Sequence, residues 1–307
     1  MNKLILLTGP TCSGKTRHGV QLARALGGEV VNFDSLLFYR ELNIGTAKPS
    51  LGEREGVPHH MIDVCSARDP MNAHDFARAA RPMVADIHAR GCPVLLVGGS
   101  GFYAQALLKG MYDSPTTPDE IKARSEALYA GEGIDPFLAE LRRHDPASAA
   151  RYHPNDHYRV RRAVEHWWAH GTPFSLQREG FVPEAPPWEV LHLHLDLPKE
   201  DHLKLIIERT RGMLAAGLEA EVRALLGSGF HGREKPLQAI GYKETVQWIA
   251  GGFGTDRAAW EERIVINTRR LAKAQRTWFQ KIVSKAYDPR TEGEALRRAG
   301  EEFIGRE

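Results

Sequence analysis

A glycine-rich loop directly after a short apolar run constrains this chain most. The run is Leu4–Leu7, and the loop from Gly9 to Thr16 reads Gly-Pro-Thr-Cys-Ser-Gly-Lys-Thr. A strand, such a loop and a helix in this order form the P-loop pattern, in which backbone N–H groups surround phosphate oxygens. We therefore predict a phosphate cradle in which Lys15 adds a charge and the Thr16 hydroxyl ligates Mg²⁺. The alternative is a glycine turn that only joins a strand to a helix.

A second glycine loop follows a later apolar run, without the carboxylate that a nucleotide hydrolase places there. Val94–Val97 continues into Gly98-Gly99-Ser100-Gly101. P-loop hydrolases commonly hold Mg²⁺ with an aspartate near the end of such a strand. We therefore expect diphosphate to leave intact rather than to be cut. The loop itself reads equally as a second surface for diphosphate oxygens or as a tight strand-to-helix turn.

The composition is that of a folded protein with one large or two modest domains. The chain has 307 residues and a formal net charge of +2, so a polyanionic partner must meet a local patch rather than bulk charge. The three cysteines, Cys12, Cys65 and Cys92, form no CxxC pair, which argues against a zinc module and for a reducing compartment. Because no apolar run has the length of a signal-peptide core or a membrane span, we expect a cytoplasmic protein without a membrane partner.

The hydrophobic pattern predicts an α/β fold, a P-loop NTPase-like parallel sheet core with a helical insertion domain. We expect strands at 3–8, 29–33, 94–97 and 189–196, core helices at 15–26 and 73–90, and insertion helices at 121–130, 136–143 and 156–169. The residues at 200–226 and 258–285 read as mostly helical, and those from Thr291 as a solvated end. The corresponding domains are 1–114 for the first part of the core, 115–187 for the insertion, and 188–307 for the second part with basic helices.

A carboxylate ends the second predicted strand, on the side of the sheet where ligands bind in parallel α/β folds. Asp34 is a candidate general base, provided that a nucleophile reaches it within about 3 Å. It is equally suited to cap a helix beginning near Leu36, and both roles are compatible.

Two segments are rich in cations. The insertion carries Arg159, Arg161 and Arg162 with several histidines nearby, and a later helix has no acid between Arg263 and Lys285 but contains Trp278-Phe279. Cations with aromatic residues suit an RNA backbone and unstacked bases. A solvated basic helix whose aromatic residues anchor it in the core is the competing interpretation. The histidines show no metal-ligand spacing.

Seven ordered motifs resemble those of the bacterial tRNA dimethylallyltransferases, also called tRNA isopentenyltransferases. They span nearly the whole chain and are Gly9–Thr16, Asp34-Ser35 with Tyr39-Arg40 and Ile44–Pro49, Val57–Asp63, Val97–Tyr103, Asn155-Asp156 with Arg159, Gln238–Glu244, and Leu271–Lys273 with Gln275 and Thr277–Phe279.

The resemblance implies transfer of a dimethylallyl group from dimethylallyl diphosphate to N6 of the adenosine at position 37 of tRNA, with Mg²⁺ and release of diphosphate. The adenine would be flipped into a channel from the side opposite the diphosphate. Asp34 would be the general base, while Lys15, Ser100 and Arg209 would meet the charge of the leaving group. We expect a monomer whose partners are a tRNA anticodon stem-loop and the prenyl diphosphate.

The same resemblance assigns the binding residues. Diphosphate would contact Gly9, Thr11, Cys12, Ser13, Gly14, Lys15 and Thr16, the last of these also holding the metal. The residues predicted to face tRNA are Asp34, Ser35, Leu36, Leu37, Ser100, Arg159, Arg162, Gln238, Gly241, Tyr242, Lys243, Lys273, Gln275 and Trp278. The alternatives are an adenylate isopentenyltransferase, a P-loop nucleotide kinase and an RNA-binding P-loop switch.

The chain departs from the family pattern at several positions. Ser100 stands where threonine is common, Cys12 where alanine is usual and Leu37 where glutamine is frequent. Ala274 and Leu205 each replace a common arginine. The last two changes predict weaker or displaced phosphate contacts to tRNA.

Overall fold

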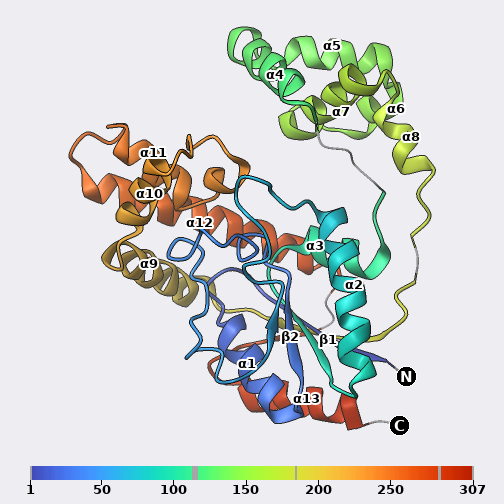
Figure 1. Cartoon of the computed structure of the whole chain (residues 1–307), viewed down its shortest axis with the longest axis vertical. Coiled ribbons are helices and arrows are strands. Elements are labelled where there is room, and N and C mark those ends of the chain that lie inside the picture. The colour runs from blue at the N-terminus through green and yellow to red at the C-terminus, as the bar shows by residue number, and fades with distance from the viewer. Residues whose placement is uncertain (1, 113–116, 184, 283–284, 306–307) are drawn as a thin grey trace. The chain divides into compact units, whose positions relative to one another are not determined.

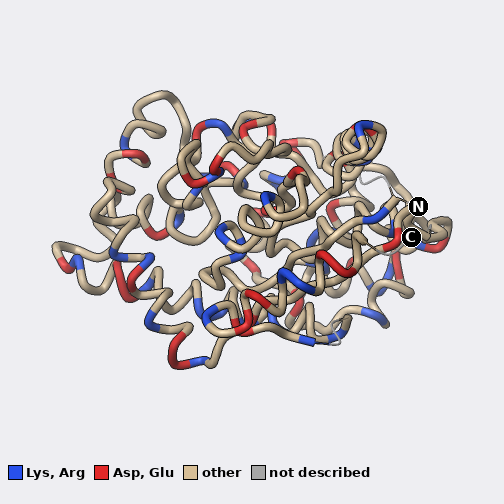
Figure 2. Tube along the Cα trace, turned by 90° about the horizontal axis from the view of Figure 1, so that it is seen from below, with Lys and Arg blue, Asp and Glu red and all other residues tan. Residues whose placement is uncertain are grey.

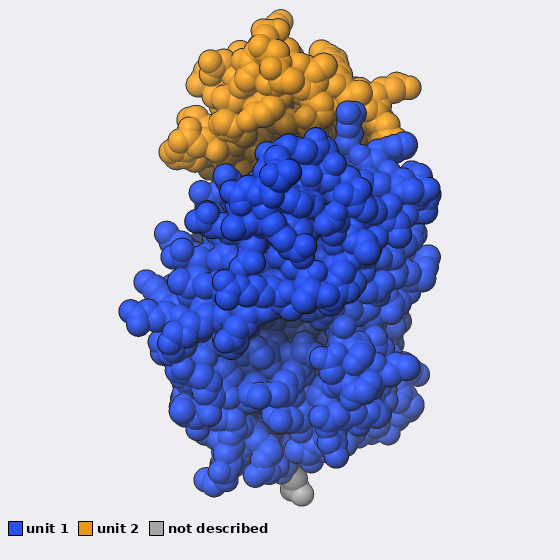
Figure 3. Space-filling model, turned by 90° about the vertical axis from the view of Figure 1, so that its left-hand side faces the viewer, with its two compact units in different colours: residues 1–108, 185–307 blue, residues 109–184 orange. Residues whose placement is uncertain are grey.

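The computed structural model describes residues 2–112, 117–183, 185–282 and 285–305, which belong to two compact units (Figure 3). Unit 1 comprises residues 1–108 and 185–307, and unit 2 comprises residues 109–184. The predicted boundary between residues 114 and 115 lies outside the described residues.

A six-stranded parallel sheet forms the centre of unit 1, which confirms the predicted fold class (Figure 1). Its order is β3-β2-β4-β1-β5-β6. The strands are β1 (Lys3–Thr8), β2 (Glu29–Asn32), β3 (His59–His60), β4 (Val94–Val97), β5 (Glu189–Leu195) and β6 (Ala286–Tyr287). The two-residue strands β3 and β6 were not predicted, because so short a segment shows no alternation of apolar and polar residues.

Alternate residues of the central strands enter two separate cores. Leu4 and Leu6 of β1 pack with residues of helices α2 (Ala73–Ala89) and α3 (Gly101–Lys109). Ile5 and Leu7 of the same strand pack with helices α1 (Lys15–Leu26) and α13 (Gly293–Gly305) on the opposite face. A parallel sheet needs this double cover, since both of its faces are apolar.

The end of the chain differs from the prediction. Residues from Thr291 were expected to be solvated, yet α13 buries Leu296 and Phe303 against the sheet core. These two residues are seven positions apart, which places them on one helical face. The prediction of a solvated end was therefore wrong.

A helical layer of unit 1 surrounds a third core that lies next to the carboxyl ends of the strands. It consists of α9 (Lys199–Ala215), α10 (Leu218–Gly227), α11 (Tyr242–Ile249), α12 (Arg257–Phe279) and the short 3-10 helix η1 (Lys235–Gln238). Helix α12 ends at the fully buried Phe279 rather than at Lys285, because the chain then turns and pairs β6 with β5.

Unit 2 is helical in its described residues. Its helices are α4 (Asp119–Glu132), α5 (Asp135–His144), α6 (Pro146–Arg151), α7 (His157–His170) and α8 (Phe174–Glu179), around a core that includes Phe137 and Val160. The buried Asp145 caps α6 through the N–H of Ser148 and also accepts the N–H of Ser175. In the part of the chain that the structure describes, no helix of either unit could span a membrane.

Candidate active site

The loop between β1 and α1 has the backbone geometry of a phosphate cradle. Gly14, which precedes α1, is left-handed with φ near 80°, a conformation that glycine adopts without strain. The Ser13 hydroxyl is buried and has no hydrogen-bond partner, so an acceptor or donor is missing from its side of the loop. This orphaned hydroxyl and the free amides of a helix N-terminus fit an oxyanion ligand.

Lys15 points back over the same loop, where its Nζ donates to the carbonyl of Pro10 at 2.8 Å. Burial lowers the pKa of Lys15 to about 8; the neighbouring carboxylate of Asp34 raises this pKa and the guanidinium of Arg209 lowers it. A diphosphate at this place would favour the charged ammonium and lift the pKa again.

A histidine and an arginine support the P-loop through a chain of hydrogen bonds. Nε2 of the buried His202 bonds the carbonyl oxygen of Thr11 at 2.6 Å, and Nη2 of Arg276 bonds the other ring nitrogen at 2.7 Å. Arg276 also pairs with Asp196 at 2.6 Å. Burial lowers the pKa of His202, which suits a neutral ring that donates to Thr11 and accepts from Arg276. Sequence reasoning missed both residues, which lie far from the loop along the chain.

Two cavities adjoin at the carboxyl ends of the strands. The first, of about 600 Å³, is lined by residues Thr11 to Thr16 and extends past Leu37 and His59. The second, of about 510 Å³, is lined by Ser100, Trp278 and apolar residues of α9 and α12. The residues that line both are Thr11, Cys12, Asp34, Thr46 and Arg209. A group held in one cavity would thus face a group held in the other across this shared wall.

Asp34 sits in the shared wall with its backbone clamped by a neighbour. The buried Asn32 accepts the N–H of Asp34 at 2.9 Å, and its amide donates to the carbonyl oxygen of Asp34 at 3.1 Å and to that of Met61. One carboxylate oxygen accepts the N–H of Leu36 at 3.2 Å. The predicted helix near Leu36 is a turn in the structure, so the cap exists but it stabilises a turn.

The second glycine loop is shaped by helix α12. A Cβ on Gly99 would lie 2.5 Å from Nε2 of Gln275, and one on Gly101 would lie 2.1 Å from Nε1 of Trp278. Gln275 in addition joins the two loops, since it accepts the N–H of Thr11 at 2.8 Å and donates to the carbonyl oxygen of Gly99 at 3.1 Å. Close packing against α12 therefore accounts for Gly99 and Gly101, whereas Gly98 lines the first cavity, and the interpretation of this loop as a second diphosphate surface stays a prediction.

Ser100 and Arg209 lie on different sides of the shared wall. The Ser100 hydroxyl accepts the backbone N–H of Ser35 at 3.3 Å and lines only the second cavity. Ser100 therefore lies on the side of the second cavity, and its predicted contact with the leaving diphosphate stays a prediction. Arg209 reaches the P-loop, where it donates to the Thr11 hydroxyl at 3.2 Å, and its other nitrogen donates to the carbonyl oxygen of Thr46 at 3.2 Å.

Of the residues predicted to contact diphosphate in the P-loop, all but one line the first cavity. Thr11 to Thr16 line the first cavity, whereas Gly9 does not. A Cβ on Gly9 would lie 2.7 Å from the carbonyl oxygen of Leu195, so Gly9 allows the chain to pass the end of β5. The exposed Thr16 and the carboxylate of Asp34 lie in the same cavity, which gives two oxygen donors of the kind that Mg²⁺ takes together with phosphate and water. In the described residues no group of three or more His, Cys, Asp or Glu side chains forms a metal site.

The unit 1 residues predicted to face tRNA differ in their surroundings. Those lining the second cavity are Asp34, Ser35, Leu36, Ser100, Gln238, Gln275 and Trp278, whereas Leu37 lines the first. Lys243 and Lys273 are exposed on α11 and α12. Gly241 and Tyr242 are buried, and Tyr242 has no exposed surface. The prediction that the Tyr242 side chain faces tRNA was therefore wrong, because its ring belongs to the core of the helical layer.

The three predicted arginines of unit 2 have acidic neighbours within that unit. Arg159 pairs with Asp156, and Arg161 pairs with Glu126 at 2.9 Å and stacks over the ring of Tyr129. Arg162 lies 3.7 Å from Glu165. Figure 2 shows basic and acidic residues interspersed along the trace. The dense basic face that the sequence suggested is thus partly neutralised, and contacts of Arg159 and Arg162 to tRNA stay a prediction.

The two aromatic residues at the end of α12 have opposite surroundings. Phe279 is fully buried beside His192 and His194, and Trp278 is 37% exposed at the second cavity. The core-anchor interpretation is confirmed for Phe279. Trp278 remains available to a ligand.

Fold and site together define a P-loop-type α/β protein in which a phosphate cradle and a second, partly apolar cavity share one wall. Comparisons with known proteins agree with this class. The model of the family described as IPP transferase matches residues 37–282. The chain belongs to this family, the tRNA dimethylallyltransferases.

Several relatives are similar over nearly their whole length. The tRNA dimethylallyltransferases of Geobacter metallireducens and Geobacter sulfurreducens are 40% and 41% identical to the chain, over 91% of it and 90% and 89% of their own lengths. Among solved structures, the tRNA isopentenylpyrophosphate transferase of Bacillus halodurans has a TM-score of 0.71 at 29% identity, with 99% of this chain and 97% of that one covered. A eukaryotic dimethylallyltransferase acting on tRNA has a TM-score of 0.79 at 27% identity, with 99% and 80% covered.

Proposed function

We propose that the protein transfers a dimethylallyl group from dimethylallyl diphosphate to N6 of the adenosine at position 37 of tRNA. The observation that carries the proposal is the shared wall: a phosphate cradle and a cavity with an exposed tryptophan meet at Asp34 and Arg209. The names of the relatives support transfer of a dimethylallyl group to tRNA. Because one chain lines both cavities, we expect it to act as a monomer.

In this proposal the prenyl diphosphate lies in the first cavity, with its phosphates on the N–H groups at the N-terminus of α1, around Gly14, Lys15 and Thr16. Thr16 would provide a hydroxyl ligand for Mg²⁺. When bound, Mg²⁺ would neutralise charge on the diphosphate oxygens. Lys15 and Arg209 add two positive charges on the same side.

The adenine lies in the second cavity, where Trp278 offers a stacking surface and Ser100 a hydroxyl. A bond forms between N6 and C1 of the prenyl group while the bond from C1 to the diphosphate oxygen breaks. The proton of N6 passes to the carboxylate of Asp34, and the electron pair leaves with the diphosphate. Lys15 and Arg209 stabilise the negative charge that develops there.

The alternatives differ in the acceptor. An adenylate isopentenyltransferase would need no RNA surface, whereas the exposed Trp278 lines the second cavity and Lys273 is exposed on the same helix. A nucleotide kinase or a P-loop switch would use ATP or GTP, and β4 ends at Val97 and is followed by Gly98 rather than by the metal-binding aspartate common in such proteins.

The test combines the protein with Mg²⁺, dimethylallyl diphosphate and an unmodified anticodon stem-loop, and identifies the product by mass. Parallel reactions replace the stem-loop with AMP, or the prenyl diphosphate with ATP. We expect a prenylated stem-loop and free diphosphate. Prenylated AMP without prenylated stem-loop, or a phosphorylated product with ATP, would refute the proposal.

A further inference from the structure

A single carboxylate outside both cavities holds the loop that forms part of their shared wall. Glu221 on α10 accepts the backbone N–H of Asn43 at 3.1 Å, that of Ile44 at 2.9 Å and that of Gly45 at 3.4 Å. Three successive amides on one carboxylate make a charge-assisted nest. Gly45, which carries the last of these amides, and the next residue, Thr46, line the second cavity.

Tyr242 fixes the same carboxylate from the core. Its hydroxyl donates to Oε1 of Glu221 at 2.6 Å, and its ring leaves no room for a side chain on Gly45, where a Cβ would lie 2.5 Å from the ring. Burial, and next the charge of Glu221, raise the pKa of Tyr242, so the hydroxyl keeps its proton. The motif that the sequence assigned to tRNA contact thus supports this carboxylate.

The loop transmits this support to Arg209. The carbonyl oxygen of Thr46 accepts Nη2 of Arg209, while Nη1 reaches the Thr11 hydroxyl of the P-loop. The hydroxyl of Thr46 donates to the carbonyl oxygens of Leu42 and Asn43, which closes the loop on itself. The guanidinium of Arg209 therefore donates to both the Thr11 hydroxyl and the Thr46 carbonyl oxygen. The position of the second of these acceptors depends on Glu221.

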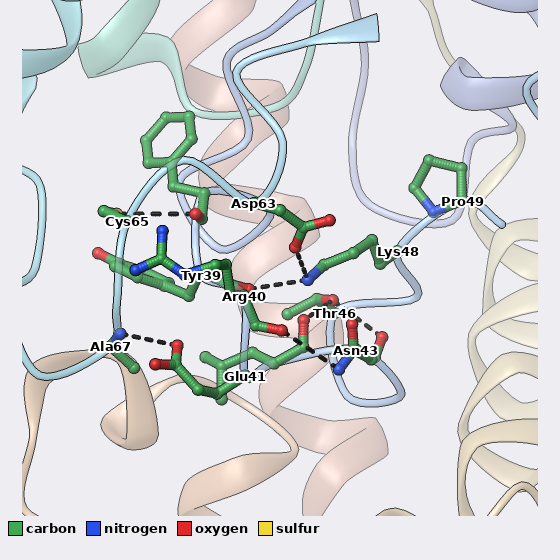
Figure 4. Close-up of polar contacts among 12 residues, drawn as sticks. Tyr39, Arg40, Glu41, Asn43, Thr46, Lys48, Pro49, Asp63, Cys65 and Ala67 are labelled. Carbon is green, nitrogen blue, oxygen red and sulfur yellow. Dashed lines mark hydrogen bonds and ion pairs between the residues drawn. The ribbon is translucent and has the colours of Figure 1, made fainter. Parts of the chain in front are cut away.

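Residues on either side of the segment Asn43–Thr46 make further contacts that hold its two ends (Figure 4). The half-buried Lys48 donates to the carbonyl oxygen of Tyr39 at 2.8 Å and pairs with Asp63. Glu41 accepts the N–H of Ala67 at 3.0 Å in the same segment. With both ends held, Thr46 has little freedom to move unless the contacts to Glu221 are lost.

We propose that Glu221, supported by Tyr242, is a positioning residue that sets the guanidinium of Arg209 for the departing diphosphate. The inference rests on the proposed function. An unrestrained arginine would lose rotamer entropy when it met the leaving group, whereas one already held between Thr46 and Thr11 does not. A purely structural role for Glu221 makes a different prediction, namely a loss of folding stability with no dependence on Arg209.

A double-mutant cycle separates the two roles. Tyr242→Phe removes one hydrogen bond and keeps the ring, and Glu221→Gln keeps the shape and removes the charge. Each is measured alone and with Arg209→Ala for kcat, for KM of both substrates and for the Kd of inorganic diphosphate. Glu219→Gln is the matched control, because Glu219 lies on the same helix, pairs with Arg223 and lines neither cavity.

We expect Glu221→Gln and Tyr242→Phe to lower kcat and weaken diphosphate binding by about tenfold, with KM for the stem-loop unchanged. In the Arg209→Ala background the same changes should have an effect within about twofold. The control should match wild type.

Equal losses with and without Arg209, or a lowered Tm with unchanged kinetics, would overturn the inference. If Glu221→Gln does not fold, the cycle with Tyr242→Phe decides. A wild type that binds diphosphate but prenylates nothing would refute the proposed reaction, while the diphosphate measurements would still decide on Glu221.

Discussion

Two glycine-rich loops follow neighbouring parallel strands, and they are glycine-rich for different reasons. The loop after β1 opens onto a cavity, with left-handed Gly14 and an orphaned Ser13 hydroxyl. The loop after β4 is pressed against α12, whose Gln275 and Trp278 occupy the space where side chains would stand. One loop presents its backbone to a ligand, and the other lets a helix approach.

The two loops therefore have different roles in the site. In the proposed reaction the first loop holds the donor, and the second loop lets α12 bring Trp278 to the cavity proposed for the acceptor. Gln275 spans both, so the two loops keep a fixed separation. Asp34 belongs to both cavities, and substitutions there and in each loop should therefore have distinct signatures.

The largest effect should follow Asp34→Asn. The amide still accepts the N–H of Leu36, so the turn should persist, but it cannot take the proton of N6. General-base catalysis contributes about 10²- to 10⁴-fold, and we expect kcat to fall by that factor with stem-loop affinity nearly unchanged. Single-turnover rates and filter binding measure the two quantities. Asp69→Asn, an exposed change, is the control, and wild-type rates for Asp34→Asn would remove this carboxylate from the mechanism.

The next effect should appear at the donor loop. Lys15→Met keeps the length of the side chain and removes its charge, so stabilisation of the leaving diphosphate is lost. We expect kcat/KM for the prenyl diphosphate to fall by about 10²- to 10³-fold, with stem-loop affinity unchanged. Steady-state kinetics with each substrate varied provides the measurement. A loss of stem-loop affinity instead would show that the donor and acceptor sides are not separate.

The first loop was predictable because its signal is local. The β1 strand, residues Gly9–Thr16 and the α1 helix lie within one short segment, and the predicted bounds of α1 equal the observed ones. The reason why the second loop contains glycines was not predictable, because it depends on close contacts with Gln275 and Trp278, which lie far along the chain. Sequence spacing carries no information about such close approach.

Other parts of the site were hidden for the same reason. His202 and Arg276 support the P-loop from α9 and α12, and nothing near them in sequence indicates that use. Tyr242 lies in a motif predicted to face tRNA, yet its ring is buried in the folded protein and its hydroxyl donates to Glu221. Short strands and the α13 helix were missed because two-residue strands lack a pattern and few apolar residues mark the helix.

A larger residue in the second loop should destabilise the protein through steric overlap with α12. Gly101→Ala introduces a Cβ within 2.1 Å of the Trp278 indole, which must shift. Overpacking of this kind costs about 1–3 kcal/mol of unfolding free energy. We expect this loss in denaturant titrations, with weaker stem-loop binding and unchanged diphosphate affinity. The double variant with Trp278→Ala should recover stability, and additive losses would contradict the packing explanation.

The smallest effect should be the pH dependence of diphosphate binding at the first loop. Burial lowers the pKa of Lys15 to about 8, so the free protein carries the ammonium below that pH and loses it above. Relative to Lys15→Arg, which stays charged, wild type should lose about tenfold in diphosphate affinity between about pH 7 and about pH 9. Titration of both proteins by calorimetry cancels the ionisation of diphosphate itself. Parallel curves for the two proteins would mean that Lys15 does not titrate in this range, and that its charge reaches the ligand at every pH tested.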